Sequence, residues 1–329
     1  MTQPHYTEVA TDIFCIETGL YRHGLASCYL IREGGRLAFV DTGTAHTVPM
    51  LLQVVAELGA TPEAVDYVIP THVHLDHAGG AGDLVAACPN ARLVIHPKGA
   101  AHMIDPSKLA AGAIAVYGEE AFEREFGHLT PVPEERVMIA EDGMAIDLGG
   151  RRLVFLHTPG HANHHGCLFD ERTRGFFTGD TFGVSYRELD NERGPLLFAP
   201  TTPVAFDPEA WQKSLDRLMR YDPCCMYLTH YARVDDPAAL VADLRESIRD
   251  LAGLALAEEG RIPDGRLERL QESVARHLIE RVRRHGCKMD EERIRELLGV
   301  DMELNAQGLE VWLARRARQA AAARGASAR

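Results

Sequence analysis

The sequence predicts a layered α/β domain over residues 1–235, followed by a helical extension over residues 236–329. Three observations carry this expectation. Short β-rich runs alternate with helical stretches and turns up to about residue 235, as in domains built from layers of strands and helices. Beyond "DDP" at 235–237 these runs stop, and apolar residues recur at helical spacing. A hydrophobic content of 46% with 25% charged residues is typical of soluble globular proteins.

The β-rich runs end in Gly, Pro, Asp or His, residues that commonly terminate strands. They read "DIFCIETG", "SCYLI", "RLAFVDTG", "DYVIPTH", "RLVIH", "RRLVFLHTPGH" and "GFFTGD". Between them, "VPMLLQVVAELG" predicts a helix closed by a glycine. The stretch "DPEAWQKSLDRLMRYDP" predicts a helix that begins at an Asp207 cap, with Pro208 in its first turn and Pro223 just beyond its end.

The extension carries apolar stripes that predict packed amphipathic helices. One stripe comprises Leu240, Leu244, Ile248 and Leu251, and another comprises Leu267, Leu270, Val274, Leu278 and Val282. Asp236 followed by Pro237 predicts a helix N-terminus. This first helix follows closely on His230, a candidate ligand, so we expect it to form a wall of the substrate pocket; the alternative is that the helices only cover the domain. Apolar surface around Trp312 is expected to serve a homodimer contact.

Charge and cysteine usage exclude several classes of protein. A formal charge of -13 argues against nucleic acid or an anionic membrane as a partner. No apolar run approaches the length that spans a bilayer, and the start "MTQPHYTEVATD" has no features of a secretory signal, so we expect a cytoplasmic protein. Seven scattered cysteines without CxxC spacing argue against a disulfide framework and against a cysteine zinc site.

Histidine and aspartate residues gather at four strand ends. They are His72, His74, Asp76 and His77 in "THVHLDHAGG"; His161, His164 and His165 in "TPGHANHH"; Asp180 in "FTGDTF"; and His230 in "YLTHY". Taken singly, the last three clusters would also fit an ordinary loop, turn or core residue. Loops at one edge of a sheet bring distant segments together, and imidazoles with carboxylates suit zinc, manganese or iron. The HxHxDH pattern therefore predicts a metal site.

The motifs "THVHLDHAGG", "TPGH", "TGD" and "LTH", in this order, resemble those of the metallo-β-lactamase fold superfamily over residues 8 to 232. The resemblance implies a four-layer αββα sandwich with metals at one edge. It also implies the ligands: His72, His74 and His161 at one metal, Asp76, His77 and His230 at the second, and Asp180 bridging both. Oxygen-reducing members carry Glu at the position of His74, so the likeness is to the hydrolytic, glyoxalase II- and lactonase-like branch and to an uncharacterised bacterial and archaeal subgroup.

The implied reaction is hydrolysis by a hydroxide that bridges two divalent ions, with zinc expected and manganese or iron as alternatives. Asp76 is expected to be a ligand that also orients this hydroxide. Asp41 in "FVDTG" is a candidate hydrogen-bond partner of a ligand histidine, or else an ordinary turn-capping aspartate. His165 is a candidate for the same supporting role or for contact with substrate, and we expect neither His164 nor His165 to bind metal.

The expected substrate is a small ester, thioester, lactone or phosphoester. True β-lactamases usually lack the ligand that Asp180 represents, and Gly183 stands where quorum-quenching lactonases carry a tyrosine, for which Tyr186 or Tyr231 would have to substitute. No clear match to the glutathione-binding residues of glyoxalase II follows Asp180. Two alternatives remain open: a mononuclear iron oxidoreductase similar to persulfide dioxygenases, and a regulatory protein with vestigial activity.

Overall fold

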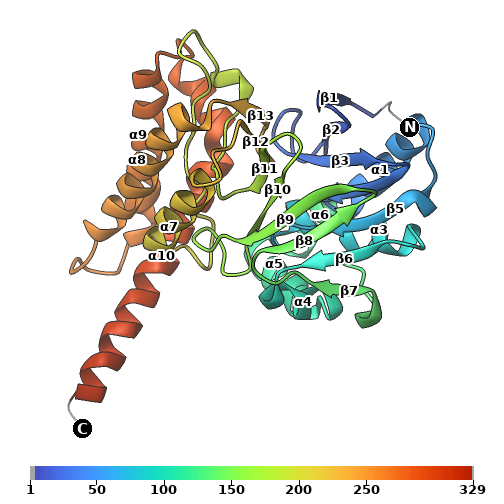
Figure 1. Cartoon of the computed structure of the whole chain (residues 1–329). Helices are drawn as coiled ribbons and strands as arrows, with labels where there is room; N and C mark the ends of the chain where they lie inside the picture. Colours follow the sequence, from blue (N-terminus) through green and yellow to red (C-terminus); the bar gives the residue numbers. More distant parts are fainter. Residues whose placement is uncertain (1–3, 328–329) are drawn as a thin grey trace.

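The computed structural model describes residues 4–327. Figure 1 shows two β-sheets packed against each other, with helices on both outer sides. The first sheet contains β1 (Tyr6–Ala10), β2 (Ile13–Glu17), β3 (Ser27–Glu33), β4 (Arg36–Val40), β5 (Val65–Ile69), β6 (Arg92–Ile95) and β7 (Val137–Ile139), side by side in this order. Strands β1 to β4 pair antiparallel, whereas β4 to β7 pair parallel because helical crossovers connect them.

The second sheet has the order β13-β12-β11-β10-β9-β8. Its strands are β8 (Met144–Leu148), β9 (Arg151–His157), β10 (Gly166–Asp170), β11 (Gly175–Gly179), β12 (Cys225–Leu228) and β13 (Ala232–Asp235). Only the β11–β12 pair among these is parallel, and the segment that joins the two strands carries a helix. The chain therefore passes from β11 to β12 by a crossover, which places the ends of both strands at the same edge of the sheet.

Helices connect strands of both sheets and follow the last strand. They are α1 (Val48–Glu57), α2 (Leu75–Ala78), α3 (Ala81–Ala87), α4 (Pro97–Ile104), α5 (Ser107–Tyr117), α6 (Glu119–Phe126), α7 (Pro208–Met219), α8 (Pro237–Leu256), α9 (Arg266–His285) and α10 (Glu291–Ser327). The expected caps are confirmed: the side chain of Asp207 accepts a hydrogen bond from the backbone N–H of Ala210, and Asp236 accepts one from Ala239. None of the helices within residues 4–327 is long and apolar enough to cross a membrane.

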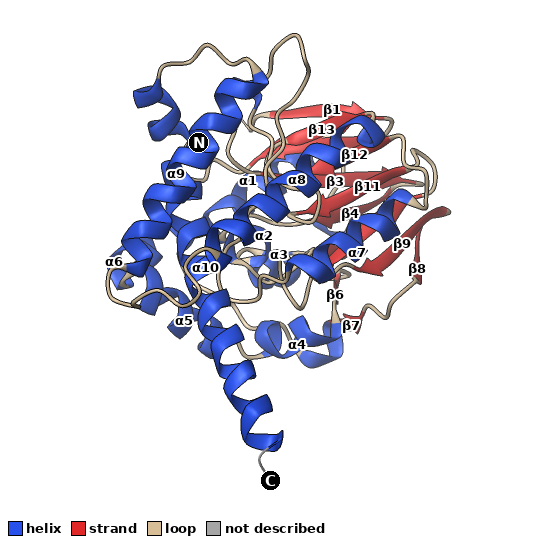
Figure 2. Cartoon of the chain, turned by 90° about the vertical axis from the view of Figure 1, so that its left-hand side faces the viewer, coloured by secondary structure: helices blue, strands red, loops and turns tan. Residues whose placement is uncertain are grey.

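Three buried clusters hold the layers together. Helices α1, α3 and α4 cover the outer face of the first sheet, the two sheets meet through residues such as Val40 and Phe155, and helices α7 to α10 cover the outer face of the second sheet. The order of layers is therefore αββα, as the resemblance implied. Figure 2 shows the helices in front of the strands from the side of α8 and α10.

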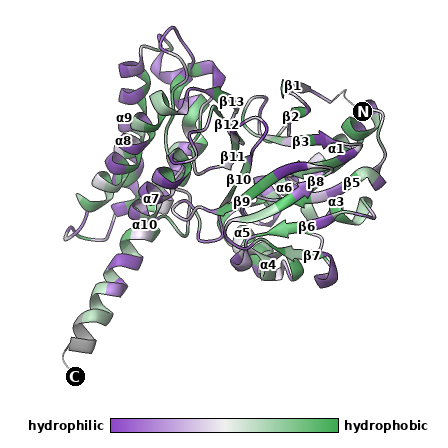
Figure 3. Cartoon of the chain, viewed as in Figure 1, coloured by the Kyte–Doolittle hydropathy of each residue, from purple (hydrophilic) through white to green (hydrophobic). Residues whose placement is uncertain are grey.

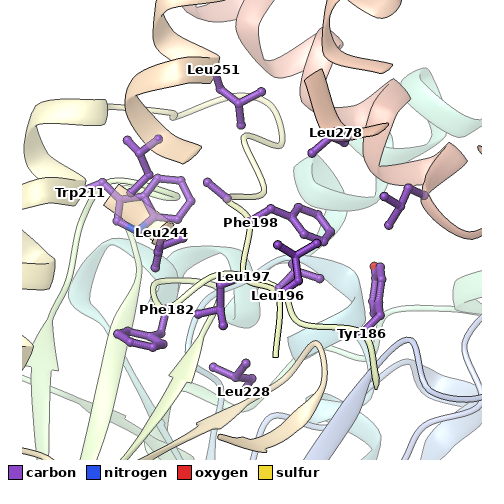
Figure 4. Close-up of a cluster of buried hydrophobic side chains, with 14 of the residues drawn as sticks. Phe182, Tyr186, Leu196, Leu197, Phe198, Trp211, Leu228, Leu244, Leu251 and Leu278 are labelled. Atoms are coloured by element: carbon purple, nitrogen blue, oxygen red, sulfur yellow. The ribbon is translucent and has the colours of Figure 1, made fainter. Parts of the chain in front are cut away.

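The C-terminal helices share one hydrophobic core with the second sheet. Trp211 of α7, Leu244 and Leu251 of α8 and Leu278 of α9 pack around Phe198, as Figure 4 shows. In Figure 3, α9 alternates hydrophobic and hydrophilic residues, which is the pattern of a helix that buries one face. Burial of aromatic and leucine side chains in this cluster stabilises the helices against the sandwich, at about 1.5 to 3 kcal/mol for each fully buried side chain.

Candidate metal centre

The segment after β5 presents four of the candidate ligands within six residues. His74 has an extended backbone, with φ -64° and ψ 150°, and the chain becomes helical at Leu75. Because of this change His72 and His74 precede α2, whereas Asp76 and His77 belong to its only turn. The side chains thus leave the backbone in different directions around one point.

Two glycines end this segment for a steric reason. Both Gly79 and Gly80 have ordinary right-handed helical φ values, so a tight left-handed bend does not explain them. A Cβ atom on Gly80 would lie 2.7 Å from the backbone oxygen of Thr44, and one on Gly79 would lie 3.2 Å from Cα of Thr44, besides meeting the Leu75 oxygen of its own turn at 2.4 Å. Glycine therefore allows the turn that carries the histidines to pack directly against the loop after β4.

The remaining ligand candidates follow β9, β11 and β12. His161, Asp180 and His230 lie in the loops after these strands and meet the segment after β5 at one edge of the sandwich. All of them are buried, and Asp180 is 4% exposed. The sequence analysis named these three residues from their positions at strand ends, and the structure brings them together.

Two groups of side chains converge at this edge. The first contains His72, His74, His161 and Asp180, and the second contains Asp76, His77 and His230. In the first group, Nδ1 of His74 lies 2.8 Å from Nε2 of His72 and 3.1 Å from Nε2 of His161. Oδ2 of Asp180 lies 3.2 Å from Nε2 of His161.

Asp180 also reaches the second group. Its Oδ1 lies 3.3 Å from Nε2 of His77 and 3.6 Å from Nε2 of His230. Oδ2 of Asp76 lies 3.1 Å from Nε2 of His230 and 3.4 Å from Nε2 of His77. One carboxylate therefore presents a different oxygen to each group of histidines, which is the arrangement that a bridging ligand requires.

Hydrogen bonds fix the orientation of the imidazoles. Nδ1 faces an oxygen in four of them: His72 with Oγ1 of Thr71 at 3.2 Å, His77 with Oδ2 of Asp41 at 2.7 Å, His161 with the carbonyl of Pro200 at 2.8 Å, and His230 with the carbonyl of Leu25 at 2.8 Å. A proton on Nδ1 leaves the lone pair of Nε2 free, and in all four rings Nε2 points into the site. The donor atoms are thus pre-oriented for a cation.

Asp41 lies beneath the second group and is fully buried. It accepts hydrogen bonds from the backbone N–H of Thr71 at 2.8 Å, from Oγ1 of Thr229 at 2.7 Å and from Nδ1 of His77. Its φ of 56° is left-handed, which aspartate tolerates better than most residues. The structure therefore places Asp41 where the sequence analysis expected a partner of a ligand histidine.

His165 stacks on the ring of His72, with 4.7 Å between the ring centroids, but neither of its nitrogens belongs to the two groups. Its Nε2 accepts a hydrogen bond from the backbone N–H of Asp180 at 3.2 Å, and its Nδ1 lies 3.0 Å from Oγ1 of Thr158 and 3.1 Å from Oγ1 of Thr181. Both ring nitrogens are occupied within the protein. His165 therefore holds the backbone of Asp180 in position, in agreement with the supporting role considered for it.

A divalent cation fits the donor atoms of both groups. Nε2 of His77 and Oδ1 of Asp180 are buried and have no hydrogen-bond partner among residues 4–327. Buried polar atoms without a partner are rare in proteins, and a metal ion would satisfy both. Zinc bound at about 2.0 to 2.1 Å in tetrahedral geometry holds its ligand atoms about 3.3 Å apart. The separations of 2.8 to 3.6 Å between the donor atoms agree with this value.

The electrostatics of the site also favour cations. Burial holds the pKa of His72 well below its usual range, so this imidazole is neutral, as a ligand must be. Burial alone would raise the pKa of the Asp180 carboxyl, but the surrounding histidines outweigh burial and lower it. Burial alone would lower the pKa of His230, but Asp180 and Asp76 raise it to about 9. Without a metal, a proton on His230 offsets the charge of these carboxylates, and a cation can take its place.

A cavity of about 380 Å³ opens directly above the ligands. Asp76, Asp180 and His230 border it at one end, and most of its other walls are apolar. From the C-terminal helices the wall residues are Val300, Asp301 and Leu304, all on α10. The expectation that α8, the first helix of the extension, would form this wall is therefore wrong: α8 packs on the second sheet, and the chain returns to the metal edge only in its last helix.

Two further expectations are changed by the packing. Tyr186 borders the cavity, but its hydroxyl donates to the Asp301 carboxylate, with distances of 3.1 and 3.2 Å to the two oxygens, so it is not free to act on a substrate. Trp312 is buried against Phe206, and Arg316 lies over its ring. Trp312 therefore does not provide the exposed apolar surface that was expected to serve a dimer contact.

Sequence reasoning did not find Asp301. This carboxyl borders the cavity, and burial raises its pKa to about 6. The surrounding sequence, "LLGVDMELNAQG", reads as an ordinary amphipathic helix in which an aspartate is expected on the solvated side. Only the crossing of α10 over the metal edge places Asp301 beside Tyr186, so no local pattern could have identified it.

The sequence profile of the family described as "Metallo-beta-lactamase superfamily" matches residues 21–230. The chain is 28% identical over 173 residues to the "Metallo-beta-lactamase fold-containing protein ST1585" of Sulfurisphaera tokodaii, covering 51% of this chain and 61% of that protein. It is 27% identical over 198 residues to the "Acyl-coenzyme A thioesterase MBLAC2" of Homo sapiens, covering 53% of this chain and 65% of that protein. The chain thus spans less than two thirds of the length of these relatives.

Two solved structures resemble the whole arrangement. ST1585 from Sulfolobus tokodaii superposes with a TM-score of 0.62 at 21% identity, covering 90% of this chain and 97% of that one. A metallo-beta-lactamase family protein from Thermus thermophilus superposes with a TM-score of 0.59 at 20% identity, covering 94% and 95%. At these identities the likeness concerns the fold, and its coverage extends beyond the sandwich into the C-terminal helices.

Proposed function

Because this chain belongs to the metallo-beta-lactamase superfamily, we propose that it is a metal-dependent hydrolase that uses two divalent ions to cleave an ester or thioester. The observation that carries the proposal is the pair of unsatisfied buried atoms, Nε2 of His77 and Oδ1 of Asp180, at the centre of seven convergent ligand side chains. A structural cluster of histidines would satisfy these atoms internally.

The proposed ligands follow the two groups. His72, His74 and His161 would hold one ion, Asp76, His77 and His230 would hold the other, and Asp180 would be a ligand of both. Zinc suits a site of imidazoles and carboxylates, with manganese and iron as alternatives. Two ions at these groups would lower the pKa of a water molecule and polarise the carbonyl oxygen of the substrate.

The side chains of the protein orient the attacking water and the metal ligands, and they enclose the cavity. Asp76 directs Oδ2 toward His230 and borders the cavity, and we propose that its carboxylate also orients the attacking water. Asp41 and His165 fix the positions of His77 and Asp180. The apolar walls of the cavity exclude bulk water, which strengthens electrostatic interactions with the reacting carbonyl.

Two considerations favour an ester or thioester over the other expected substrates. The cavity beside the ligands is mostly apolar, which suits an acyl group better than a phosphate diester. A relative at 27% identity carries the name acyl-coenzyme A thioesterase. Both considerations support the proposal for this chain without requiring a particular leaving group.

The test is hydrolysis of p-nitrophenyl esters and acyl thioesters by the zinc-loaded protein. We expect activity that chelation abolishes and that zinc restores. Asp180→Asn should abolish hydrolysis, whereas Asp83→Asn, the same substitution outside the cavity, should leave it intact. Zinc-loaded protein that cleaves none of these substrates would contradict the proposal, and a protein that holds one iron and oxidises a persulfide would replace it.

A further inference from the structure

Exposed apolar side chains of the described residues gather at the mouth of the metal cavity. Those that border the cavity are Tyr21, Val116, Tyr117, Val204 and Val300, with exposed fractions from 37% to 68%. They come from four segments that are distant in the sequence. Large apolar groups scattered singly over a surface need no explanation, but several around one opening mark a place where an apolar ligand enters.

Helix α5 contributes one long wall of this cavity. Its sequence "SKLAAGAIAVY" is mostly apolar, yet none of its residues is buried. An apolar helix of a globular protein normally buries its apolar face against a neighbour. Leu109 and Ala113 pack partly against α6 and also border the cavity, as does Val116 on the next turn. The remaining apolar surface of α5 therefore faces a space that a ligand can fill.

Helix α10 contributes a second wall. Val300 and Leu304, one turn apart, border the same cavity as α5, and Figure 2 shows α10 passing in front of this region of the molecule. Pro203 and Val204 of the loop before α7 border it as well. The candidate metal ligands border one end of the cavity. A substrate would therefore place its reacting carbonyl at that end and its apolar portion between α5 and α10.

We propose that this cavity binds the hydrocarbon chain of an acyl substrate, so that the enzyme prefers long acyl groups over short ones. The inference rests on the proposed function for the reaction, but the binding of the chain is a separate property. A volume of about 380 Å³ lies in the range of small-molecule sites and exceeds what an acetyl group needs. Each methylene that moves from water into the cavity should raise kcat/KM about fourfold.

Gly112 offers a way to fill the cavity without disturbing the protein. It borders the cavity from α5, and a Cβ atom added to it would meet nothing within 4 Å. Its backbone is helical without a positive φ, so a side chain introduces no strain. Gly112→Phe should occupy the space of the hydrocarbon chain. Gly253 of α8 is also a helical glycine in open space and does not border the cavity, so Gly253→Phe is the matched control.

The experiment measures kcat/KM for p-nitrophenyl acetate, hexanoate and decanoate with the zinc-loaded wild type and both variants. We expect a steep rise with chain length in the wild type and in Gly253→Phe, and a nearly flat profile in Gly112→Phe, because kcat/KM for decanoate falls toward that for acetate. A flat profile in the wild type, with ester hydrolysis intact, would overturn the inference and leave the proposed hydrolase standing. So would a long-chain preference that Gly112→Phe does not change.

If no ester is cleaved, a binding measurement can still test the acyl-chain site separately from the proposed hydrolysis. Calorimetry of the zinc-loaded protein with decanoate and with acetate compares ligands that share a carboxylate and differ only in the chain. Decanoate has eight more methylenes than acetate, so we expect it to bind at least about a thousandfold more tightly, and Gly112→Phe to remove this difference. Such a result without hydrolysis would retain the acyl-chain site and contradict the reaction, whereas equal affinities of the two ligands would contradict the acyl-chain site.

Discussion

Replacing Asp41 by asparagine isolates the support beneath the second group of ligands. The side chain keeps its size, and asparagine also tolerates the left-handed φ of 56°. The carboxylate accepts hydrogen bonds at both oxygens: Oδ1 from the backbone N–H of Thr71, and Oδ2 from Nδ1 of His77 and Oγ1 of Thr229. An amide has one acceptor oxygen and one NH2 group, so Asp41→Asn cannot accept at both places.

Either orientation of the amide has a cost. If its oxygen stays with Thr71, the NH2 group faces Nδ1 of His77, and the imidazole must move its proton to Nε2, the atom 3.3 Å from Asp180. Metal affinity should then fall about 10- to 100-fold. If the oxygen instead stays with His77, the buried N–H of Thr71 loses its acceptor, at about 1 to 3 kcal/mol of folding free energy.

Two assays distinguish these outcomes. Competition with a chromogenic chelator measures zinc affinity, and urea denaturation of metal-free protein measures the free energy of unfolding. Asp83→Asn serves as the control, because its carboxylate also accepts from a threonine hydroxyl but does not border the metal cavity. Wild-type values of both quantities in Asp41→Asn would refute the view that Asp41 orients His77.

Four further substitutions test three separate parts of the structure. His77→Ala and His230→Ala should each lower the bound metal, measured by elemental analysis, from about two ions to one, while retention of both would exclude the ligand assignment. In metal-free protein, Asp301 has a pKa of about 6 against an ordinary 3.8, so its ionisation destabilises the fold as pH rises from about 4 to 6. Asp301→Asn should therefore gain about 1 to 3 kcal/mol at pH 7.5 and nothing below pH 4 in urea denaturation, and a gain independent of pH would contradict this cause. Arg151 and Asp170 form a fully buried ion pair, so Asp170→Asn should lose about 3 to 5 kcal/mol, and a loss under 1 kcal/mol would show that the pair is dispensable.

The metal edge could be predicted from sequence because its signals are local. Histidine and aspartate side chains that directly follow short apolar runs lie at strand ends, and strand ends of a layered α/β domain meet at one edge. The division of the ligands into two groups came from the resemblance, since spacing alone does not tell which loops face each other. His165 could not be separated from a ligand by sequence, because only its contacts with Thr158 and Thr181 determine where its nitrogens point.

The path of the C-terminal helices could not be predicted in the same way. Apolar stripes show that α8, α9 and α10 bury one face, but they do not show which neighbour each helix covers. The expectation that α8 would form the pocket wall relied on proximity in sequence to His230. In the structure α8 packs on the second sheet without bordering the cavity, and α10, about sixty residues later, supplies Val300 and Leu304 to it.

The central claim is that two metal ions at these ligands are required for hydrolysis. The most direct test adds zinc stepwise to chelator-treated protein while bound metal and decanoyl thioester cleavage are measured in the same samples. The account predicts two bound equivalents, with activity that reaches its maximum only as the second site fills. Full hydrolysis in verified metal-free protein, or maximal activity with a single bound ion, would contradict it.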